Sequence, residues 1–295
     1  MKVTEDPFVA HRGLLFTVAY EMLGSAAEAE DVTQEAWLRW DAIGPAARDE
    51  VRDPRAYLVR VVTRKALDRL RANARRREEY VGEWLPEPLL TAPDVAEDVE
   101  LAESVSFAML TVLETLTPTE RAVFVLREVF DLAYDEIAQA VDKSPAAVRQ
   151  IAHRARGHVA ARHPRVEVSP TEQREVVERF LAAVAGGDLQ GLLDALAPDV
   201  VLVSDGGGVA QAVVNPVTGA KKVANLLRGF PAAAAGATVV PVLLNGAPGA
   251  RVDGLPDGYD SAIGFAVRGG RISRIYIVRN PAKLRYLDVV TPLGR

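Results

Sequence analysis

Cysteine is absent from this chain of 295 residues. Its absence excludes disulfide bonds, zinc sites built on thiolates and cysteine nucleophiles. No apolar run approaches the roughly 18 residues that a membrane span needs, and the first residues lack the basic and then apolar pattern of a signal peptide. The content of 49% hydrophobic and 25% charged residues is otherwise that of a globular protein. We therefore expect a cytoplasmic protein of two or three domains that does not bind a membrane.

Charge of one sign is missing from three stretches of the chain. Residues 54–77 hold nine Lys/Arg and one acid, Asp68, whereas residues 78–103 hold nine acids and no Lys/Arg. Residues 143–165 hold six Lys/Arg and no acid. The formal net charge of -5 conceals this separation. Two basic helical segments joined by an acidic one favour a protein that binds a polyanion at two separate places.

Hydrophobic periodicity divides the chain into helical and mixed parts. Apolar residues recur at helical spacing from about residue 8 to 80 and again from about 101 to 162. Residues 84–88, Trp-Leu-Pro-Glu-Pro, cannot form a regular helix because their two prolines remove donors and restrict their neighbours. From Thr171 onward two helices precede a set of strands, so this part is α+β. The expected strands are Val200–Val203, Ala237–Leu244 and two runs that flank a hairpin signal at Gly269-Gly270, Ala262–Val267 and Arg271–Val278.

Residues 132–156 have the pattern of a helix-turn-helix. A short helix should end near Val141, Asp142-Lys143 should form the turn, and Ser144 should cap a second helix that begins at Pro145. The second helix has one apolar face, formed by Val148, Ile151, Ala152, Ala155 and Val159. The DNA-contacting candidates lie at its start and on the remaining arc: Ser144, Arg149, Gln150, His153, Arg154 and Arg156. An amphipathic hairpin with a solvated basic face is the alternative, but the absence of acids favours DNA contact because an ordinary solvated face mixes signs.

Several stretches resemble parts of a known protein family. Residues 116–127, which begin Leu-Thr-Pro-Thr-Glu-Arg, resemble sigma-factor region 4 together with the helix-turn-helix, and residues 29–39 and 53–71 resemble regions 2.2 and 2.3–2.4. Their order resembles the extracytoplasmic-function sigma factors, which lack regions 1 and 3. The subgroup with a SnoaL-like (NTF2-like) extension is indicated by residues 84–88 and by two short signatures. These signatures are Asp205-Gly206-Gly207-Gly208 and Asn280-Pro281-Ala282-Lys283-Leu284.

This resemblance implies a multidomain fold with two all-α DNA-binding domains and an α+β NTF2-like cone. The implied parts are region 2 in residues 1–80, an acidic linker in 81–100, region 4 with the helix-turn-helix in 101–165, and a SnoaL-like regulatory domain in 170–295. The implied function is that of an alternative sigma factor. It binds core RNA polymerase and promoter DNA, recognises the -35 and -10 elements and melts the latter. We expect no enzymatic activity, no cofactor, no metal and a monomer when free.

The resemblance also assigns surfaces to the two partners. The helix from Asp31 to Arg39 is assigned to the polymerase, through Asp31, Gln34, Glu35 and Arg39. Residues 21–36 carry five acids and no base, so this surface should repel DNA but could meet basic groups of the polymerase. Trp37 and Trp40, on the same helix, are expected in the core.

The first basic block is assigned to the melted -10 element, through Arg60, Arg64, Lys65, Arg69, Arg71, Arg75 and Arg76. Strand opening needs a cationic groove and a pocket for an extruded base. The sequence does not identify that pocket, although the loop of residues 44–52 and the start of the basic helix are the places where we expect it. The alternative is a solvated face of intrahelical ion pairs, for which the single acid of the block supplies too few partners.

The acidic linker permits two interpretations. It could follow basic polymerase channels and cover the basic modules before assembly, or it could be a soluble, extended tether. Trp84 and Leu85 are too apolar for a pure tether, so we expect them to dock, with the C-terminal domain as the expected surface. The candidate regulatory residues are Trp84, Leu85, Pro86, Asp205, Gly206, Gly207, Gly208, Asn280, Pro281, Lys283 and Leu284. Lys usually follows the first signature, and Val209 stands there instead.

Regulation is favoured over catalysis for the C-terminal domain. No histidine follows His163, and Asp205 beside three glycines indicates a turn rather than a buried base. The cone could nevertheless hold a small-molecule ligand, and an enzyme or sensor tethered to a DNA-binding module is the main alternative. A dimeric repressor that binds duplex DNA without polymerase is a further one.

Overall fold

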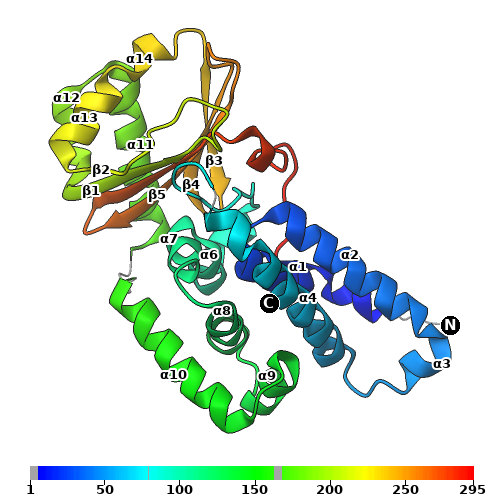
Figure 1. Cartoon of the computed structure of the whole chain (residues 1–295). Helices are drawn as coiled ribbons and strands as arrows, with labels where there is room; N and C mark the ends of the chain where they lie inside the picture. The colour runs from blue at the N-terminus through cyan, green and yellow to red at the C-terminus, as the bar shows by residue number, and fades with distance from the viewer. Residues whose placement is uncertain (1–5, 79, 163–167) are drawn as a thin grey trace. The chain divides into compact units, whose positions relative to one another are not determined.

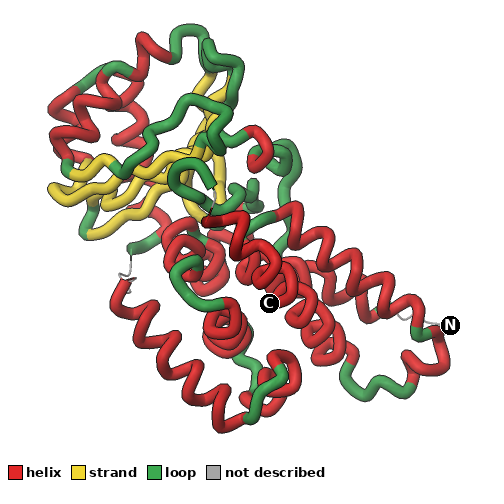
Figure 2. Tube along the Cα trace, viewed as in Figure 1, coloured by secondary structure: helices red, strands yellow, loops and turns green. Residues whose placement is uncertain are grey.

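The computed structural model describes residues 6–78, 80–162 and 168–295. The chain divides into two compact units. The first comprises residues 1–76, 109–164 and 292–295, and the second comprises residues 77–108 and 165–291. Figure 2 shows helices in both units, and the strands lie between residues 196 and 278. The expected combination of two helical domains with an α+β domain is confirmed.

Four helices form the N-terminal part of the first unit: α1 (Pro7–Leu23), α2 (Ala26–Ala42), α3 (Gly44–Asp49) and α4 (Pro54–Glu78), all labelled in Figure 1. Ser25 Oγ accepts a hydrogen bond from Glu28 N at 3.2 Å and caps α2. Asp53 Oδ1 accepts one from Ala56 N at 2.9 Å, so α4 begins at its proline as predicted.

The two tryptophans of α2 differ in burial. Trp40 is fully buried, and its ring packs 5.7 Å from that of Tyr57 between centroids. Trp37 is half-buried, with its ring 5.1 Å from that of Phe8. The expected core position is therefore confirmed for Trp40, whereas Trp37 lies at the edge of the core.

The second helical part of this unit is formed by α8 (Pro118–Phe124), the π-helix η1 (Val125–Val129), α9 (Tyr134–Val141) and α10 (Pro145–Arg162), preceded by α7 (Phe107–Leu113). Asp142 ends α9 in the left-handed conformation with φ 55°. Ser144 Oγ accepts a hydrogen bond from Ala147 N at 3.2 Å at the start of α10. All five residues of the predicted apolar face of α10 are buried. The predicted helix-turn-helix is thus present with its expected boundaries.

The second unit is built on a six-stranded sheet with the order β2-β1-β6-β5-β4-β3. The strands are β1 (Leu196–Asp205), β2 (Val217–Thr218), β3 (Thr238–Leu244), β4 (Ala247–Asp253), β5 (Ser261–Arg268) and β6 (Arg271–Val278). β1 and β6 pair in parallel, and the other pairs are antiparallel. The predicted hairpin joins β5 and β6. β4 was not predicted, because Pro248 and Gly249 interrupt the alternation of its residues.

Helices cover one face of this sheet, as Figure 1 shows. They are α11 (Pro170–Gly186), α12 (Leu189–Ala195), α13 (Ala220–Arg228) and α14 (Phe230–Ala233). Residues such as Phe180 and Val223 pack on Leu202 and Ile275 in this layer. Because side chains alternate along a strand, the neighbouring residues Val203 and Tyr276 point to the other face.

That other face is covered by the segment between the two helical parts of the first unit. Leu85 and Phe107 pack there with Val203, Tyr276 and Leu287. The segment also contains two short helices, α5 (Pro93–Glu97) and α6 (Val99–Val105). The acidic linker is therefore a packed layer of the second unit rather than an extended tether.

Candidate functional site

The three subgroup signatures meet in one cluster of the second unit, which we call the linker-docking cluster (Tyr80, Trp84, Leu85, Asp205, Asn280 and Lys283). Its centre is Asp205, the last residue of β1, whose exposed fraction is 1%. Its carboxylate accepts hydrogen bonds from Tyr80 Oη at 2.6 Å, Leu85 N at 2.9 Å and Lys283 Nζ at 2.7 Å. The carboxylate thus holds both the linker and the C-terminal signature.

The interpretation of Asp205 as a turn residue needs correction. Its carboxylate does accept the Gly207 N–H at 3.0 Å, as in a turn. The side chain is nevertheless buried and ion-paired with Lys283. A buried carboxylate is tolerated only when it is paired and hydrogen-bonded, and the partners at residues 80, 85 and 283 are remote in the sequence.

Lys283 is the cation of the cluster. Its Nζ donates to Leu85 O at 2.6 Å and lies 4.0 Å from the ring centroid of Trp84 and 4.9 Å from that of Tyr80. Both ring faces attract a cation, so the ammonium group binds the linker through three residues. Burial, followed by the hydrogen bond to Asp205, raises the pKa of Tyr80, whose hydroxyl therefore stays protonated and donates.

The glycines of the first signature allow close approach to Asn280. A β-carbon at Gly207, where φ is 61°, would lie 2.3 Å from Asn280 Nδ2. That same amide nitrogen donates to Tyr80 Oη at 2.8 Å. Val209, at the position where Lys is usual, is 59% exposed. Because Lys283 supplies the cation for Asp205, the substitution at this position does not leave the carboxylate unpaired.

The other predicted regulatory residues lie around the cluster. Pro86 is buried in the docked linker, and Leu284 packs on the face that Leu85 covers. Pro281 begins the short 3-10 helix η2 (Pro281–Lys283), which presents Lys283. A β-carbon at Gly206 would lie 2.2 Å from Ala210 O, whereas Gly208 is exposed. The structure therefore brings the three signatures together, and the expected docking of Trp84 and Leu85 on the C-terminal domain is confirmed.

Asn245 extends the docking beyond the signatures. Leu89 N donates to Asn245 Oδ1 at 3.0 Å, Asn245 N donates to Leu89 O at 2.9 Å, and Asn245 Nδ2 donates to Val105 O at 2.9 Å. Thr91 N donates to Leu243 O at 3.0 Å, so the linker continues along the end of β3. Sequence reasoning missed Asn245. The pair Asn245-Gly246 signals a turn but not a side chain that fixes a remote segment.

The cations assigned to the -10 element have intramolecular partners in the first unit. Arg60 Nη1 donates to Gln139 Oε1 of α9, and Arg64 Nη2 donates to Gln139 O at 2.8 Å. Arg71 pairs with Asp68 at 3.2 Å. Lys65 and Arg69 pair with acids of α2. Arg75 and Arg76 lie on α4, but their side chains are outside the described part of the chain.

These pairs correct one step of the sequence argument. The single acid inside the basic block supplies too few partners within α4 itself. Partners come instead from α2 and α9, which pack beside α4 within the same unit. The acids of the polymerase surface also need one correction, because Glu21 is fully buried. The four residues assigned to the polymerase are more accessible: Asp31, Gln34 and Arg39 are exposed, and Glu35 is half-buried.

The -35 candidates form one exposed surface on α10. Ser144, Arg149, Gln150, His153, Arg154 and Arg156 are all exposed. Arg156 Nη2 donates to Glu128 Oε1 at 3.0 Å, and this hydrogen bond raises the pKa of Arg156. The Arg149 guanidinium lies 5.6 Å from the ring centroid of Tyr134. This arrangement presents long donors from one helix, as major-groove contact requires.

A buried arginine joins the two helical parts of the first unit. Arg121 of α8 is 2% exposed, and its Nε donates to Glu21 O of α1 at 3.1 Å. Its Nη1 donates to Glu114, and burial lowers the pKa of Arg121 to about 9. The C-terminal residues pack on the same unit: Gly294 N donates to Thr17 Oγ1 at 3.1 Å, and Arg295 Nη2 donates to Val129 O at 2.8 Å.

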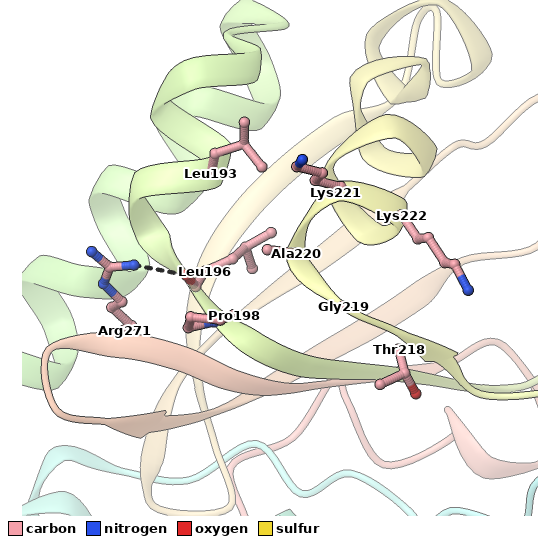
Figure 3. A pocket seen from close by; sticks show the side chains of 9 residues that line it. All are labelled: Leu193, Leu196, Pro198, Thr218, Gly219, Ala220, Lys221, Lys222 and Arg271. Atoms are coloured by element: carbon pink, nitrogen blue, oxygen red, sulfur yellow. Dashed lines mark hydrogen bonds between the residues drawn. The ribbon is translucent and has the colours of Figure 1, made fainter.

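A cavity of about 440 Å³ opens beside α12, α13 and the start of β6 (Figure 3). Leu193, Leu196 and Pro198 give it an apolar wall. Its lining holds no carboxylate or imidazole, and its charged groups are cations: Lys221, Lys222 and Arg271. Among the described residues, no group of three or more His, Asp or Glu side chains could hold a metal ion.

Comparisons with known proteins agree with this arrangement. The Sigma-70 region 2 family matches residues 8–76, and the Sigma-70 region 4 family matches residues 106–159. The ECF RNA polymerase sigma factor SigJ of Mycobacterium tuberculosis is 40% identical over 297 residues, which cover 96% of this chain and 93% of that protein. The chain belongs to the ECF RNA polymerase sigma factors. This ECF sigma factor is also similar, at 33% identity over 93% of its length, to the probable ECF sigma factor SigI of the same organism, of which 92% is covered.

A solved structure is similar over most of this ECF sigma factor. The crystal structure of Mycobacterium tuberculosis SigJ matches with a TM-score of 0.75 and 38% identity, and the match covers 94% of this chain and 96% of that one. The sigma-factor resemblance of regions 2 and 4 is thus confirmed, and with it a function in promoter-directed transcription initiation. Within the described residues, no helix combines the length and apolarity needed to cross a bilayer.

Proposed function

We propose that this chain binds core RNA polymerase and directs it to promoters through two separate contacts, with α4 on the -10 element and α10 on the -35 element. The observation that carries the proposal is the presence of two basic helical surfaces on the modules that match sigma regions 2 and 4. Promoter elements lie apart on DNA, and phosphate binding at each requires clustered cations. The acidic face of α2, with Asp31, Gln34 and Glu35, is the proposed polymerase contact, together with Arg39.

Residue roles follow from where the donors lie. On α10, Ser144 starts the helix and Arg149, Gln150 and His153 are placed to reach base edges, while Arg154 and Arg156 suit phosphates. On α4, the arginines and Lys65 are proposed to track the backbone of the melted strand. Stacking platforms usually assist single-strand binding, and the half-buried Tyr57 at the start of α4 is the aromatic available there.

The free protein is proposed to be a closed form. Arg60 and Arg64 donate to Gln139 of the helix-turn-helix, so two -10 cations are occupied by the -35 module itself. The segment between the modules is held by the linker-docking cluster on the C-terminal domain. Binding to two promoter elements then requires the α4–α9 contact to open. The C-terminal domain regulates this step by holding or releasing the linker.

Run-off transcription with purified core polymerase tests the main proposal. The wild-type protein should give a promoter-dependent transcript on cognate candidate promoters. Arg149→Ala should reduce it strongly, whereas Arg162→Ala, near the other end of the same exposed helix, should not. Equal effects of the two variants would contradict the assigned -35 surface. Absence of any promoter-dependent transcript would overturn the function.

The assignment as a monomeric, polymerase-dependent factor needs its own measurement. Light scattering of the free protein should give the mass of one chain. Duplex promoter fragments should bind weakly without polymerase and tightly with it. A dimer that binds duplex DNA tightly alone would favour the repressor alternative.

A small-molecule ligand is a second proposal, supported by the cavity beside α13. Its apolar wall and three cations would suit a small amphiphilic anion, such as an aromatic carboxylate. Benzoate and salicylate can be titrated into the full-length protein by calorimetry, with Arg271→Gln as the variant and Arg285→Gln, on an exposed arginine outside the cavity lining, as the control. No heat with the wild-type protein, or equal heat with Arg271→Gln, would dismiss this class of ligand.

A further inference from the structure

An aromatic side chain lies among the arginines of the -35 surface. Tyr134 is the first residue of α9, and two guanidinium groups lie over its ring, that of Arg127 at 4.9 Å and that of Arg149 at 5.6 Å from the centroid. Hydrogen bonding to Glu128, followed by that to the Tyr134 hydroxyl, raises the pKa of Arg156. We call Arg127, Tyr134, Arg149 and Arg156 together the Tyr134 platform.

The backbone around Tyr134 fixes the position of the ring. Asp131 adopts the left-handed conformation with φ 48°, and the next residue, Leu132, is buried. Ala133 N donates to Glu136 Oε2 at 3.0 Å, which fixes the start of α9. Tyr134 itself is half-buried. Because a tyrosine side chain has only two torsions, a ring on such a backbone is a rigid surface.

The two arginines that contact the ring differ in their other partners. Arg127 Nη1 donates to Leu132 O at 2.9 Å and pairs with Asp131 at 3.0 Å, so the loop before α9 anchors its guanidinium. Within the part of the chain that the structure describes, no carboxylate pairs with Arg149, and its contact is the Tyr134 ring. The ring therefore bears on the arginine that is otherwise least constrained.

This constraint matters because Arg149 has a long and exposed side chain. Such a side chain has many rotamers and loses that freedom when it binds a base. A cation over an aromatic face is attracted to it, so the ring favours a subset of these rotamers before DNA arrives. Arg156 lies seven positions further along α10, on the same face, and the Glu128 carboxylate holds it at 3.0 Å.

We infer that Tyr134 is a positioning residue for base recognition, whose ring holds the Arg149 guanidinium ready for a base edge of the -35 element. The inference rests on the proposed function, which assigns Arg149 to base edges and Arg156 to phosphates. A cation–π contact at an exposed site corresponds to a factor of about two to five in an equilibrium constant. Tyr134 therefore changes how strongly one base is preferred, by acting through Arg149.

A purely structural role for the ring has a different signature. If Tyr134 only stabilised the helix-turn-helix, its loss would weaken transcription from every -35 sequence by the same factor. Loss of positioning instead weakens the preference at the one position that Arg149 reads. The distribution of the effect over promoter sequences separates the two roles.

The test is transcription by core polymerase and the full-length protein from candidate promoters randomised over the -35 element, with a transcribed barcode for each sequence. The wild-type protein should prefer certain bases. Arg149→Ala should flatten the preference at the position that this arginine reads, where a good contact is worth roughly 5- to 150-fold. Tyr134→Leu should reduce the preference at that same position about two- to five-fold and leave the other positions unchanged.

Two single variants and one double variant serve as controls. Tyr134→Phe keeps the aromatic face and should retain the wild-type preference. Val141→Ala, at a buried position of the same helix, should lower transcription from all sequences alike, because it loosens the packing of the module. Tyr134→Leu/Arg149→Ala should be no flatter than Arg149→Ala, since residues that act through one another are non-additive.

Several outcomes would overturn the inference. These are an unchanged preference in Tyr134→Leu, a uniform loss like that of Val141→Ala, equal flattening in Tyr134→Phe and Tyr134→Leu, and an unchanged preference in Arg149→Ala. If the wild-type protein transcribes no member of the library, the proposed function itself fails. Thermal unfolding of each variant confirms that folded proteins are compared.

Discussion

Replacement of the buried carboxylate in the linker-docking cluster should release the linker from the C-terminal domain. In Asp205→Asn the neutral amide can still occupy the site, but the Lys283 ammonium loses its counter-charge while it remains 8% exposed. Removal of one partner from a buried ion pair typically costs about 3–5 kcal/mol. The amide would also present an N–H₂ group to the Leu85 N–H or the Tyr80 hydroxyl, which both donate to the present carboxylate.

Hydrogen exchange at Leu85 reports this change directly. The Leu85 N–H donates to Asp205 Oδ2 at 2.9 Å, so its exchange requires the linker to leave the cluster. A loss of about 3 kcal/mol corresponds to exchange that is roughly 100-fold faster, since each 1.4 kcal/mol is a factor of ten. The amide of Leu89, bonded to Asn245, should follow if the linker undocks as one segment.

A matched control lies on the same strand. Asp199 of β1 pairs with Arg268 at 2.7 Å, the same distance as the Asp205–Lys283 pair, but both of its side chains are exposed. Asp199→Asn should leave the protection of Leu85 unchanged, because exposed pairs contribute little. Unaltered protection in Asp205→Asn, or equal acceleration in the two variants, would refute the view that the buried pair holds the linker.

The double variant Asp205→Asn/Lys283→Met sharpens the result. Methionine removes the unpaired cation and keeps apolar contact with Trp84 and Tyr80. Residues that interact directly show non-additive effects, so the double variant should lose less protection than the sum of the two single changes. Additive losses would show that the two residues act separately.

Three further predictions address other parts of the chain. Gly264→Ala places a β-carbon 2.4 Å from the Phe107 ring. The free energy of unfolding should fall by about 1–3 kcal/mol, and an unchanged midpoint of urea unfolding would contradict the described packing of the linker layer. Ser144→Ala removes the cap of α10 and should cost about 1 kcal/mol, measured by thermal unfolding, with the exposed Ala146→Ser as the comparison and no loss as the contrary result. Because Glu35 has a pKa lowered from 4.5, its contribution to stability is present above that pH and is lost as pH falls through the lowered value. The difference in unfolding free energy between the wild-type protein and Glu35→Gln should therefore shrink on acidification. A difference that grows would contradict the pairing.

Local patterns allowed accurate prediction where the determining residues are close in sequence. The apolar face of α10 and its cap depend on residues within one or two turns, and all were predicted with their boundaries. The β5–β6 hairpin likewise follows from the two glycines between its strands. The helix-turn-helix and the hairpin could be predicted because short-range spacing determines them.

Long-range pairing explains what the sequence did not reveal. Asp205 resembles a turn residue because its neighbours are glycines, while the partners that bury it lie more than 70 residues away. The cations of α4 find too few partners on their own helix because their partners are on α2 and α9. Glu21 belongs to an acidic stretch that we expect at a surface, yet it is buried where Arg121 of α8 donates to its backbone carbonyl. Charge patterning locates such groups on helices but not the helix that faces them.

The packed linker also has a consequence for the order in which the protein is made. Leu85 and Phe107 leave the ribosome early, but the sheet face that they cover is complete only when β6 has been synthesised. At roughly 5–20 residues per second, translation from residue 108 to residue 278 takes about 10–35 s. From residue 162 onward in that interval, both DNA-binding modules have been synthesised while the linker has no complete sheet to dock on. A pause or truncation between residues 162 and 278 would yield a chain with both modules and a linker that has no complete sheet to dock on.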